Sequence, residues 1–432
     1  MLQGLMLNGP MLKALFKSAS LRAAAALGLG GVAFAIGNLI LARALPSHEY
    51  GLVSLVIGIV AVSGLTAPLG FDLVVARRGF GLDRRWRRAV LIASVGTGAA
   101  TLLISAIAYR LDPRLLVCVS IMTIASGVMQ ASAAHFQGQR QFGQAVWILQ
   151  FSNVALVAVA LVTPLFGFAT AVGPSVLMTV TTVAAASAGW LLVARQLRLN
   201  GNSGYLPAPG SVFGEALALM TITTSSSVFL QLERLLVAPL VGVHELALFG
   251  VLAALVGSPF RMLQAAVQFT LVPTLRAANV PRDRRRLVRR EAVQVAVAGA
   301  VCCGAIWLLA PPIAHWFLSG RYDLSDALMV AALVSGVLKV FCAFALATVV
   351  ALAPERGLRA LSVISWLSIG LSLIGALIGA HWGLIGVLYG ISAGWLTRSV
   401  LAAWLAVPHL REAVTPPGLA ASARESLAGR GG

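Results

Sequence analysis

The chain has 432 residues, of which 59% are hydrophobic and only 11% are charged. Soluble domains carry about 25% charged residues, so this composition excludes an ordinary soluble globular protein. A formal net charge of +18 would suggest nucleic-acid binding on a soluble domain. Here the positions of the basic residues, given below, explain the charge, and we expect no nucleic-acid partner.

Long apolar segments with few charges follow one another along the chain, and each can cross a ~30 Å hydrocarbon core as a helix. Residues 1–19 before them are expected to form an N-terminal interfacial segment, and residues 408–432 after them a flexible C-terminal tail. The apolar segments predict an all-α membrane protein with about twelve transmembrane helices, at residues 20–44, 49–76, 87–109, 114–137, 142–165, 168–195, 212–240, 245–275, 292–318, 325–352, 357–379 and 382–407.

The basic residues are concentrated on one side of this topology. With both termini in the cytoplasm, the cytoplasmic segments carry 24 Lys and Arg residues and the opposite side only four. Because basic residues near span ends are retained in the cytoplasm, this asymmetry predicts that orientation in the cell, or inner, membrane. The arginine runs at residues 77–88 and 282–290 either serve only the orientation or also hold anionic lipid head groups.

The four cysteines, Cys118, Cys302, Cys303 and Cys342, all lie within predicted spans. There they act most simply as small apolar side chains. Their spacing gives neither a disulfide framework nor a zinc site. We therefore expect no metal and no cofactor, and we identify no catalytic residue.

The longest polar interruption, residues 196–211, is rich in asparagine, glycine and proline and is interpreted as a cytoplasmic linker. It separates a predicted N-terminal bundle of six helices, residues 20–195, from a C-terminal bundle of six, residues 212–407. Since each bundle has an even number of spans, both enter the membrane from the same side.

The two bundles show a weak internal repeat. Residues 42–55 resemble residues 238–252 at an offset of 196, and each contains a His-Glu pair. An Asp-Arg-Arg triplet follows the second span, at residues 83–85, and also the eighth, at residues 283–285. A parallel repeat with a pseudo-twofold axis along the membrane normal is typical of transporters that enclose a central cavity between the halves.

The seventh span is the least lipid-like of the predicted helices. Thr223, Ser227, Gln231 and Arg234 recur at steps of four, four and three, which places them in one polar stripe. The stripe either lines a cavity or lets hydroxyls bond backbone carbonyls where helices pack closely. The adjacent Glu233 points about 100° away from Arg234 and can instead meet a base on another helix.

Three further cations lie within apolar spans, where an arginine costs roughly 2.5–3.5 kcal/mol on insertion scales. Arg261 is near the middle of the eighth span, directly after Gly257-Ser258-Pro259, where we expect a helix kink. It either faces an aqueous cavity that attracts anions or belongs to a structural ion pair. Lys339 and Arg398 are candidates for the same role, although Arg398 lies nearer the cytoplasmic end.

The end of the second span supplies candidates for the cytoplasmic entrance, namely Asp72, Arg77 and Arg78. Asp72 either contributes to the entrance or simply neutralises the two arginines. The fourth span carries a weaker polar stripe on one face: Ser126, Gln130 and Gln137.

The intramembrane bases outnumber the deep acid, Glu233, so the interior of the bundles is net cationic. A cavity of that sign favours anionic substrates, and arginine offers forked hydrogen bonds to phosphate oxygens. A lipid pyrophosphate fits this chemistry. The expected partners are therefore a lipid-linked anionic substrate and the membrane lipids themselves.

Four short motifs occur in order along the chain: Ala42 to Leu52, Leu69-Gly70-Phe71 through Arg77, Phe136-Gln137-Gly138 with Gln141-Phe142-Gly143, and Trp382 to Gly386. Together they resemble the oligosaccharide, or O-antigen, flippases of bacterial polysaccharide export. That family shares a superfamily with the peptidoglycan lipid flippases and the multidrug and toxin extrusion transporters. Pro68 and Asp72 depart from the family pattern, in which an acidic and a small polar residue are expected.

The resemblance implies a V-shaped pair of six-helix bundles around a central cavity. It also implies that the chain moves a lipid-linked oligosaccharide from the cytoplasmic to the outer leaflet by alternating access, for surface polysaccharide biosynthesis. Polysaccharide polymerase or export proteins would be its protein partners. The resemblance carries no substrate-binding residue with it, so the candidate site rests on the charged and polar positions above.

Other functions leave different signatures in the sequence. A glycosyltransferase or polymerase would need catalytic groups in a sizeable external loop, and the external loops are short. A cation-coupled drug antiporter of the same superfamily would need membrane-embedded carboxylates. An export scaffold without transport of its own is a further alternative. A phosphate-binding loop of the G-x-x-x-x-G-K-[ST] type does not occur, which argues against direct ATP hydrolysis.

Overall fold

The computed structural model describes residues 19–79, 81–139, 141–200, 208–278 and 280–410. Throughout these residues the regular elements are helices, and they contain no strand. The all-α class expected from the apolar segments is therefore confirmed. The segment at 1–18 and the tail at 411–432 lie outside the described residues.

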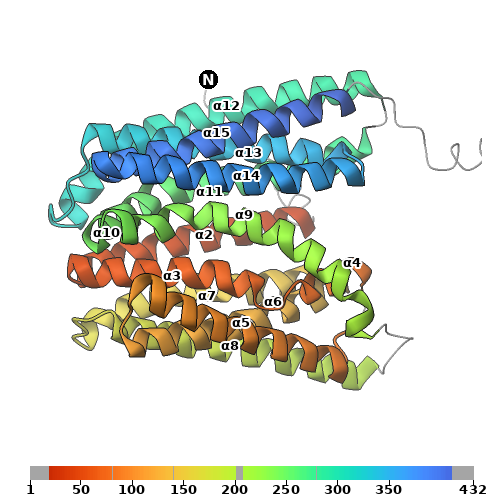
Figure 1. Ribbon diagram of the computed structural model, residues 1–432, viewed down its shortest axis with the longest axis horizontal. Coiled ribbons are helices and arrows are strands. Elements are labelled where there is room, and N and C mark those ends of the chain that lie inside the picture. Colours follow the sequence, from red (N-terminus) through yellow and green to blue (C-terminus); the bar gives the residue numbers. More distant parts are fainter. Residues whose placement is uncertain (1–18, 80, 140, 201–207, 279, 411–432) are drawn as a thin grey trace, which may run out of the picture.

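The first half of the chain forms seven long or short helices that run side by side in the lower part of Figure 1. They are α2 (Ala19–Ala44), α3 (Ser47–Thr66), α4 (Phe71–Arg78), α5 (Arg84–Tyr109), α6 (Pro113–Gly138), α7 (Phe142–Leu165) and α8 (Val172–Asn200).

The second half occupies the upper part of the same view. After a short turn, η1 (Pro209–Val212), it consists of α9 (Phe213–Leu240), α10 (Val243–Leu252), η2 (Ala253–Gly257), α11 (Ser258–Ala277), α12 (Pro281–Pro312), η3 (Ile313–Phe317), α13 (Asp326–Leu352), α14 (Glu355–Gly379), η4 (Ala380–Trp382) and α15 (Gly383–His409).

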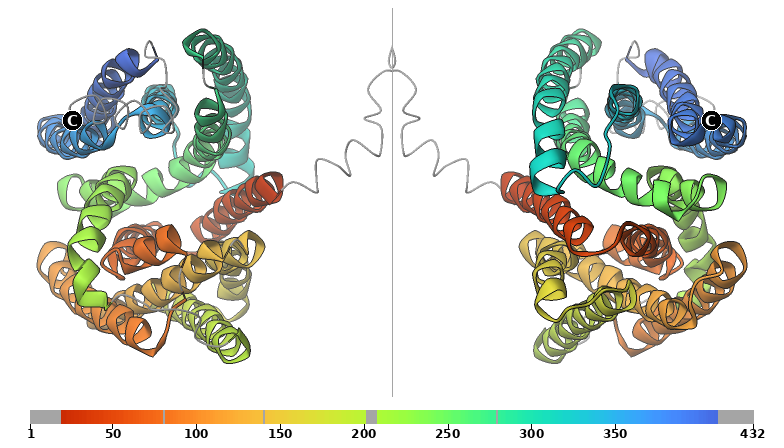
Figure 2. Two further views of the ribbon diagram at one scale, coloured as in Figure 1. Left: turned by 90° about the vertical axis from the view of Figure 1, so that its right-hand side faces the viewer. Right: turned by 90° about the vertical axis from the view of Figure 1, so that its left-hand side faces the viewer.

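These two halves form two lobes. The end-on views of Figure 2 show them as separate clusters of helices. The lobes touch where α3 packs against α9 and α10 and where α2 packs against α11. A central region between two six-span bundles, as the sequence predicts, is therefore present, and the α2, α3, α9 and α11 helices form its walls.

The helices are long and apolar enough to account for the expected spans. Ten segments of the described residues meet the length and composition of a membrane-spanning helix. One of them, Arg356–His409, contains both α14 and α15, and the described apolar part of α2 is the shorter segment Gly28–Ala44. The exposed side chains along these helices include many large apolar ones, among them Leu308, Trp316 and Trp404, as expected for surfaces that face lipid.

The expectation of one continuous second span, 49–76, is wrong. That segment is broken between α3, which ends at Thr66, and α4, which begins at Phe71. Within the break Leu69 has φ 49° and Gly70 has φ 79°. Pro68 has no N–H to donate, and Gly70 tolerates positive φ because it lacks a Cβ. A Cβ there would also lie 2.0 Å from the carbonyl oxygen of Ala216, so the break lets α4 approach the start of α9.

The eighth span is irregular at the expected place, although the irregularity is a widened turn rather than a simple break. The π-helical turn η2 immediately precedes α11, and Pro259 stands at the beginning of α11. Because the first N–H groups of a helix lack intrahelical partners, proline is tolerated there. A π turn of this kind often marks a functional position in a helix.

The internal repeat is visible in the helix boundaries. The α2 helix ends at Ala44 and α9 at Leu240, while α3 begins at Ser47 and α10 at Val243, so both boundaries recur at the offset of 196 residues. The Asp-Arg-Arg triplets are less equivalent, because Asp83 caps α5 whereas Asp283 lies inside the first turn of α12. The α8 helix continues to Asn200, five residues into the segment expected to be a linker.

Candidate substrate cavity

A cavity of about 760 Å³ lies between the two lobes. We call it the central cavity. Its wall comes from α2, α3 and α7 of the first lobe and from α9, α11 and α12 of the second. The lining residues are Gly28, Gly31, Phe34, Ile57, Ala61, Gln150, Asn153, Gln231, Arg234, Ser258, Pro259, Arg261, Met262, Leu263, Ala265, Ala266 and Cys302.

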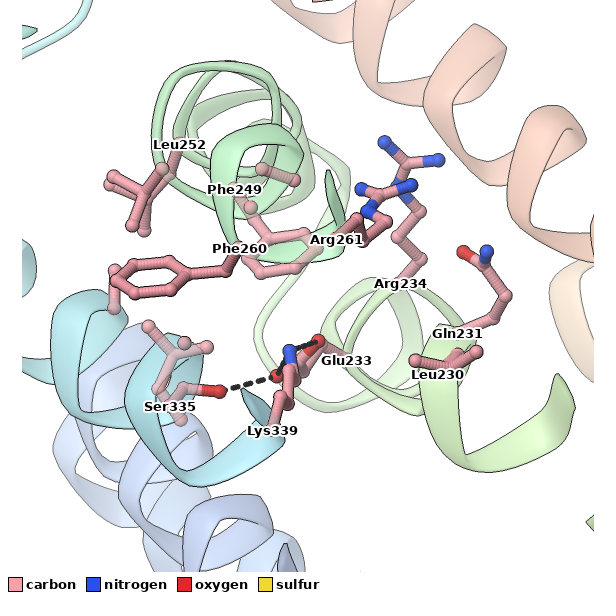
Figure 3. Close-up of a pocket in the computed structure, with 16 residues that line it drawn as sticks. Leu230, Gln231, Glu233, Arg234, Phe249, Leu252, Phe260, Arg261, Ser335 and Lys339 are labelled. Atoms are coloured by element: carbon pink, nitrogen blue, oxygen red, sulfur yellow. Dashed lines mark hydrogen bonds and ion pairs between the residues drawn. The ribbon is translucent and has the colours of Figure 1, made fainter. Parts of the chain in front are cut away.

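Two of the predicted cations meet at this cavity. Arg234 of α9 and Arg261 of α11 place their guanidinium carbons 5.2 and 5.1 Å from the ring centroid of Phe34, on α2 of the opposite lobe. Both guanidinium groups point the same way in Figure 3, away from the second lobe. Such cation–π contacts are worth about 0.5–2 kcal/mol each, far less than the cost of burying a charge.

Neither arginine makes an ion pair within the part of the chain that the structure describes. The Arg234 side chain is only 2% exposed, and its Nη1 and Nη2 atoms have no hydrogen-bond partner among the described residues. A buried, unpaired guanidinium is costly unless an anion or water completes it. The pair therefore provides forked donors suited to a phosphate or carboxylate that enters the central cavity.

The third predicted cation, Lys339 of α13, is neutralised by Glu233. Its Nζ atom donates to both carboxylate oxygens, at 2.5 and 2.7 Å, and Ser335 Oγ donates to Glu233 Oε1 at 2.9 Å. Figure 3 shows this cluster on a different face of α9 from the guanidinium groups. The expectation that Glu233 meets a base on another helix is confirmed. The cluster borders a small cavity of about 50 Å³ that Arg234 and Arg261 also line.

Arg398 of α15 is placed elsewhere, in the interior of the second lobe. It is 2% exposed, its Nη2 atom donates to Ser226 Oγ at 3.1 Å, and its guanidinium lies 5.2 Å from the ring centroid of Phe229 and 5.9 Å from that of Trp395. Arg398 lines neither of the two cavities above. The structure thus separates it from Arg234 and Arg261 and surrounds it with α9 and α15 side chains.

The polar stripe on α9 divides into two parts. Gln231 and Arg234 line the central cavity. Ser227 is buried and donates to the carbonyl oxygen of Ala61 on α3, at 3.3 Å, so it belongs to the contact between the lobes. Thr223 is half-buried and lies outside the cavity lining. The Gln231 and Arg234 end of the stripe therefore lines the cavity, whereas Ser227 serves the close packing of two helices.

The candidates for the cytoplasmic entrance, Asp72, Arg77 and Arg78, do not form ion pairs with one another. Arg77 and Arg78 both contact Glu215, in the first turn of α9, with N···O distances of 3.5 and 2.5 Å. Asp72 is 7% exposed, and its Oδ1 atom has no hydrogen-bond partner among the described residues. The idea that Asp72 neutralises the two arginines is wrong, because Asp72 is buried whereas both arginines, on the same helix α4, contact Glu215 of α9.

Among the residues of the central cavity that sequence reasoning missed, Phe34, Gln150 and Asn153 matter most for its chemistry. Phe34 gave no signal, because an aromatic residue in an apolar span is unremarkable. Gln150 and Asn153 were a detectable signal, since two amides three residues apart inside the span at 142–165 are rare and costly at bilayer depth. In the structure Asn153 Nδ2 donates to Gln150 Oε1 at 2.8 Å, and both line the cavity.

Comparisons with known proteins place this cavity in a family context. A family model described as polysaccharide biosynthesis protein matches residues 40–296. None of the curated protein sequences matches the chain.

Several solved structures share the fold. An inward-facing multidrug resistance MATE family transporter of the MOP superfamily matches with a TM-score of 0.65 at 14% identity, covering 88% of this chain and 94% of that chain. The lipid II flippase MurJ, in an inward closed conformation, matches with a TM-score of 0.61 at 11% identity, covering 89% of this chain and 87% of that chain. An outward-facing MATE transporter matches with a TM-score of 0.54 at 14% identity, covering 91% and 95%.

Proposed function

Because the chain belongs to the polysaccharide biosynthesis protein family, we propose that it is a flippase for a lipid-linked oligosaccharide. Its substrate is a glycan on a polyprenyl pyrophosphate, and transport runs from the cytoplasmic to the outer leaflet by alternating access of the central cavity. The structural similarity to the lipid II flippase MurJ supports this reading.

One observation carries the proposal. Arg234 and Arg261 lie side by side at the wall of the central cavity without an acidic partner among the described residues. Two unneutralised guanidinium groups next to one cavity favour an anion with several oxygens, and a pyrophosphate offers this at the membrane end of a lipid-linked sugar. The lipid tail remains in the bilayer, and the glycan occupies the aqueous space.

The orientation of transport follows from the topology. The ends of α4, α6, α8, α11, α13 and α15 lie on one side of the molecule, on the right of Figure 1, together with the two arginine runs. We infer that this side is cytoplasmic, with both termini there and the chain in the inner membrane. Cysteine labelling tests this orientation. An impermeant thiol reagent applied to intact cells should label Arg114→Cys and leave Arg286→Cys unmodified.

The decisive experiment is complementation of a strain that lacks its flippase for surface polysaccharide. Arg261→Ala is expected to abolish complementation at normal protein level, and Arg234→Gln to reduce export about ten- to hundredfold, because a charge-assisted hydrogen bond is worth about 1.5–3 kcal/mol. Arg286→Ala, an exposed arginine on α12, is the matched control and should complement fully. Unchanged export in both cavity variants would remove the two arginines from transport.

The fold also supports a second function, because multidrug MATE transporters share it. A cation antiporter requires a carboxylate that can exchange a cation with the cavity. Glu233, which lines the small cavity beside Arg234 and Arg261, is paired with Lys339, and the charged residues that line the central cavity are both arginines. Drug resistance conferred by the chain, and lost in Glu233→Gln, would favour the antiporter over the flippase.

Catalysis by the chain itself is not part of the proposal. The similar structures are transporters and a flippase by their descriptions. Polysaccharide polymerase and export proteins remain expected partners, which act on the glycan before or after it crosses the membrane.

A further inference from the structure

The first lobe contains a second cavity, of about 290 Å³, which we call the N-lobe cavity. Helices α3, α6, α7 and α8 form its wall, and Phe34 of α2 closes one side. Six neutral polar side chains line it: Ser126, Gln130, Ser152, Asn153, Thr181 and Thr182. Its lining includes no charged residue, in contrast to the cationic wall of the central cavity.

The N-lobe cavity adjoins the central cavity. Both are lined by Phe34, Ile57, Ala61 and Asn153. The ring of Phe34 is also the surface on which the guanidinium groups of Arg234 and Arg261 lie. An anion held by the two arginines would therefore stand next to Phe34, and a group attached to that anion could extend past the ring into the N-lobe cavity.

The polar side chains of the N-lobe cavity have unused hydrogen-bonding capacity. Ser126, Gln130 and Ser152 make no hydrogen bond to another described residue, although all three are partly buried. The hydroxyls of Thr181 and Thr182 donate to the carbonyl oxygen of Met178, at 3.0 and 2.7 Å, which leaves their oxygens free to accept.

Such groups are costly inside a helical bundle unless water or a ligand satisfies them. Because they include amides and hydroxyls, they offer both donors and acceptors. Hydroxyl groups of an uncharged sugar are themselves donors and acceptors, so the two sets are complementary. A drug cation would call for a carboxylate in the wall and an acidic sugar for a basic side chain, and the lining of this cavity contains neither.

The remaining wall suits the apolar faces of a sugar ring. Met122, Met129 and Met178 line the cavity and are nearly buried. Methionine is flexible and fills irregular gaps, so a wall of this kind accommodates rings of differing shape. The volume is at the lower end of the ~300–1,000 Å³ of small-molecule pockets, which suits the first sugar of a glycan rather than a whole oligosaccharide.

We propose that the N-lobe cavity is a subsite for the uncharged sugar attached to the pyrophosphate, with Gln130 and Asn153 as its specificity-determining residues. This inference rests on the proposed flippase function and adds a division of labour to it. The arginines of the second lobe hold the pyrophosphate, and the neutral side chains of the first lobe select the sugar. A substrate held in this way spans both lobes, so it is sensitive to their relative position.

The test is binding to the purified full chain in lipid nanodiscs. The probes are farnesyl pyrophosphate and farnesyl pyrophosphate carrying one glucose, galactose, N-acetylglucosamine or glucuronic acid. At least one uncharged sugar is expected to tighten binding by about three- to tenfold over the bare pyrophosphate, since a neutral hydrogen bond is worth about 0.5–1.5 kcal/mol. Glucuronic acid should give no such gain, because no basic side chain lines the N-lobe cavity.

Two variants and one control test whether the gain in affinity from the sugar comes from the N-lobe cavity. Gln130→Leu should reduce the gain from the sugar to about onefold while leaving the affinity for farnesyl pyrophosphate unchanged. Asn153→Leu, at a residue that lines both cavities, should likewise lower the ratio of the affinity for the sugar-bearing probe to that for the bare pyrophosphate. Gln137→Leu, on the same helix as Gln130 but exposed and outside the cavity lining, should keep the full gain. Retained binding of the bare pyrophosphate also shows that each variant is folded.

The possible failures are distinguishable. If the bare pyrophosphate binds but no uncharged sugar improves binding, or if the gain survives both leucine variants, the subsite is wrong and the flippase proposal stands. If farnesyl pyrophosphate does not bind, or binds equally well to Arg261→Gln, the proposed function itself is wrong and the subsite falls with it.

Discussion

At the scale of single residues, Glu233 and Arg234 are adjacent in the sequence but have different surroundings. Glu233 faces α13 and pairs with Lys339, whereas Arg234 faces the first lobe beside Arg261 and Phe34. The 100° rotation between successive helical residues produces this separation. As a result the acid neutralises a lysine behind the cavity wall and leaves the cavity arginines cationic.

The Glu233–Lys339 pair should behave as one unit in stability. Glu233→Gln leaves a buried ammonium unpaired, and Lys339→Met leaves a buried carboxylate with only Ser335 as donor, so each single change should destabilise the protein by about 3–5 kcal/mol. The double variant removes both charges and should unfold at a higher temperature than either single variant. Thermal unfolding in nanodiscs measures this, with Glu245→Gln at the outer end as the control. Additive losses in the double variant would show that the pair contributes no coupling.

Part of this site could be predicted from residue types alone. Arg234 and Arg261 were identifiable because a charge at bilayer depth is rare and needs a reason. The pairing of Lys339 with Glu233 joins residues 106 positions apart and depends on which faces of α9 and α13 meet, which one helix cannot reveal. Phe34 was not predictable, because its role comes from two arginines of the other lobe.

At the scale of elements, the α14–α15 hairpin packs through glycines. A Cβ on Gly375 would lie 2.6 Å from the carbonyl oxygen of Gly390, and one on Gly379 would lie 2.1 Å from that of Gly386. Membrane helices gain no hydrophobic drive from each other, so small residues that allow close backbone contact stabilise such pairs. The spacing of glycines along both helices therefore has a structural cause.

Gly375→Val should force the two helices apart. Overpacking of a close contact costs about 1–3 kcal/mol, which should appear as a lower unfolding temperature and a lower yield of folded protein. Gly370→Val on the same helix is the matched control, because a Cβ there meets nothing within 4 Å. Both variants carry the same change in helix propensity, so equal losses would assign the effect to propensity rather than packing.

The lengths of the apolar segments predict the helices themselves, and most of the expected spans correspond to one helix each. The break at residues 67–70 had a local signal, since Pro68 and Gly70 stand two residues apart in the sequence, but the apolar run around them concealed it. The left-handed conformation of Leu69 has no sequence signature. The next residue, Gly70, lies against the carbonyl oxygen of Ala216 of α9, which is a tertiary contact.

At the scale of the whole molecule, the two ends of the lobe interface differ in kind. At the end that we propose faces outward, a Cβ on Gly51 would lie 2.3 Å from the carbonyl oxygen of Val243, and the buried Tyr322 donates to the carbonyl oxygen of Ala42 at 3.3 Å. At the other end, which we propose is cytoplasmic, the lobes are joined by the contacts of Arg77 and Arg78 with Glu215. The even span count and the repeat predicted two lobes, but not these contacts, which join distant segments.

This asymmetry bears on how the cavity opens. The arginine side chains of the cytoplasmic ion pairs are 67% and 45% exposed. Exposed pairs of this kind are worth about 0–1 kcal/mol each and weaken with salt. Separating the outer ends instead requires packed helices to part and buried hydrogen bonds to break. The cytoplasmic end should therefore open at lower cost, and the charge on Glu215 should control how often it does so.

Reversal of that charge tests the idea. Glu215→Lys places three cations together, so the lobes should separate at the cytoplasmic end, and spin labels at Arg85 and Arg286 in a background without native cysteines should report longer distances. Arg77→Glu with Arg78→Glu, added to Glu215→Lys, restores the attraction with reversed sign and should return the distances to those of the parent. Labels at Asp112 and Asp323, at the outer end, should not move in either case. If the labelled cytoplasmic distance is the same in Glu215→Lys and in the parent, the ion pairs do not hold the lobes together, and the charge on Glu215 does not control the opening of this end.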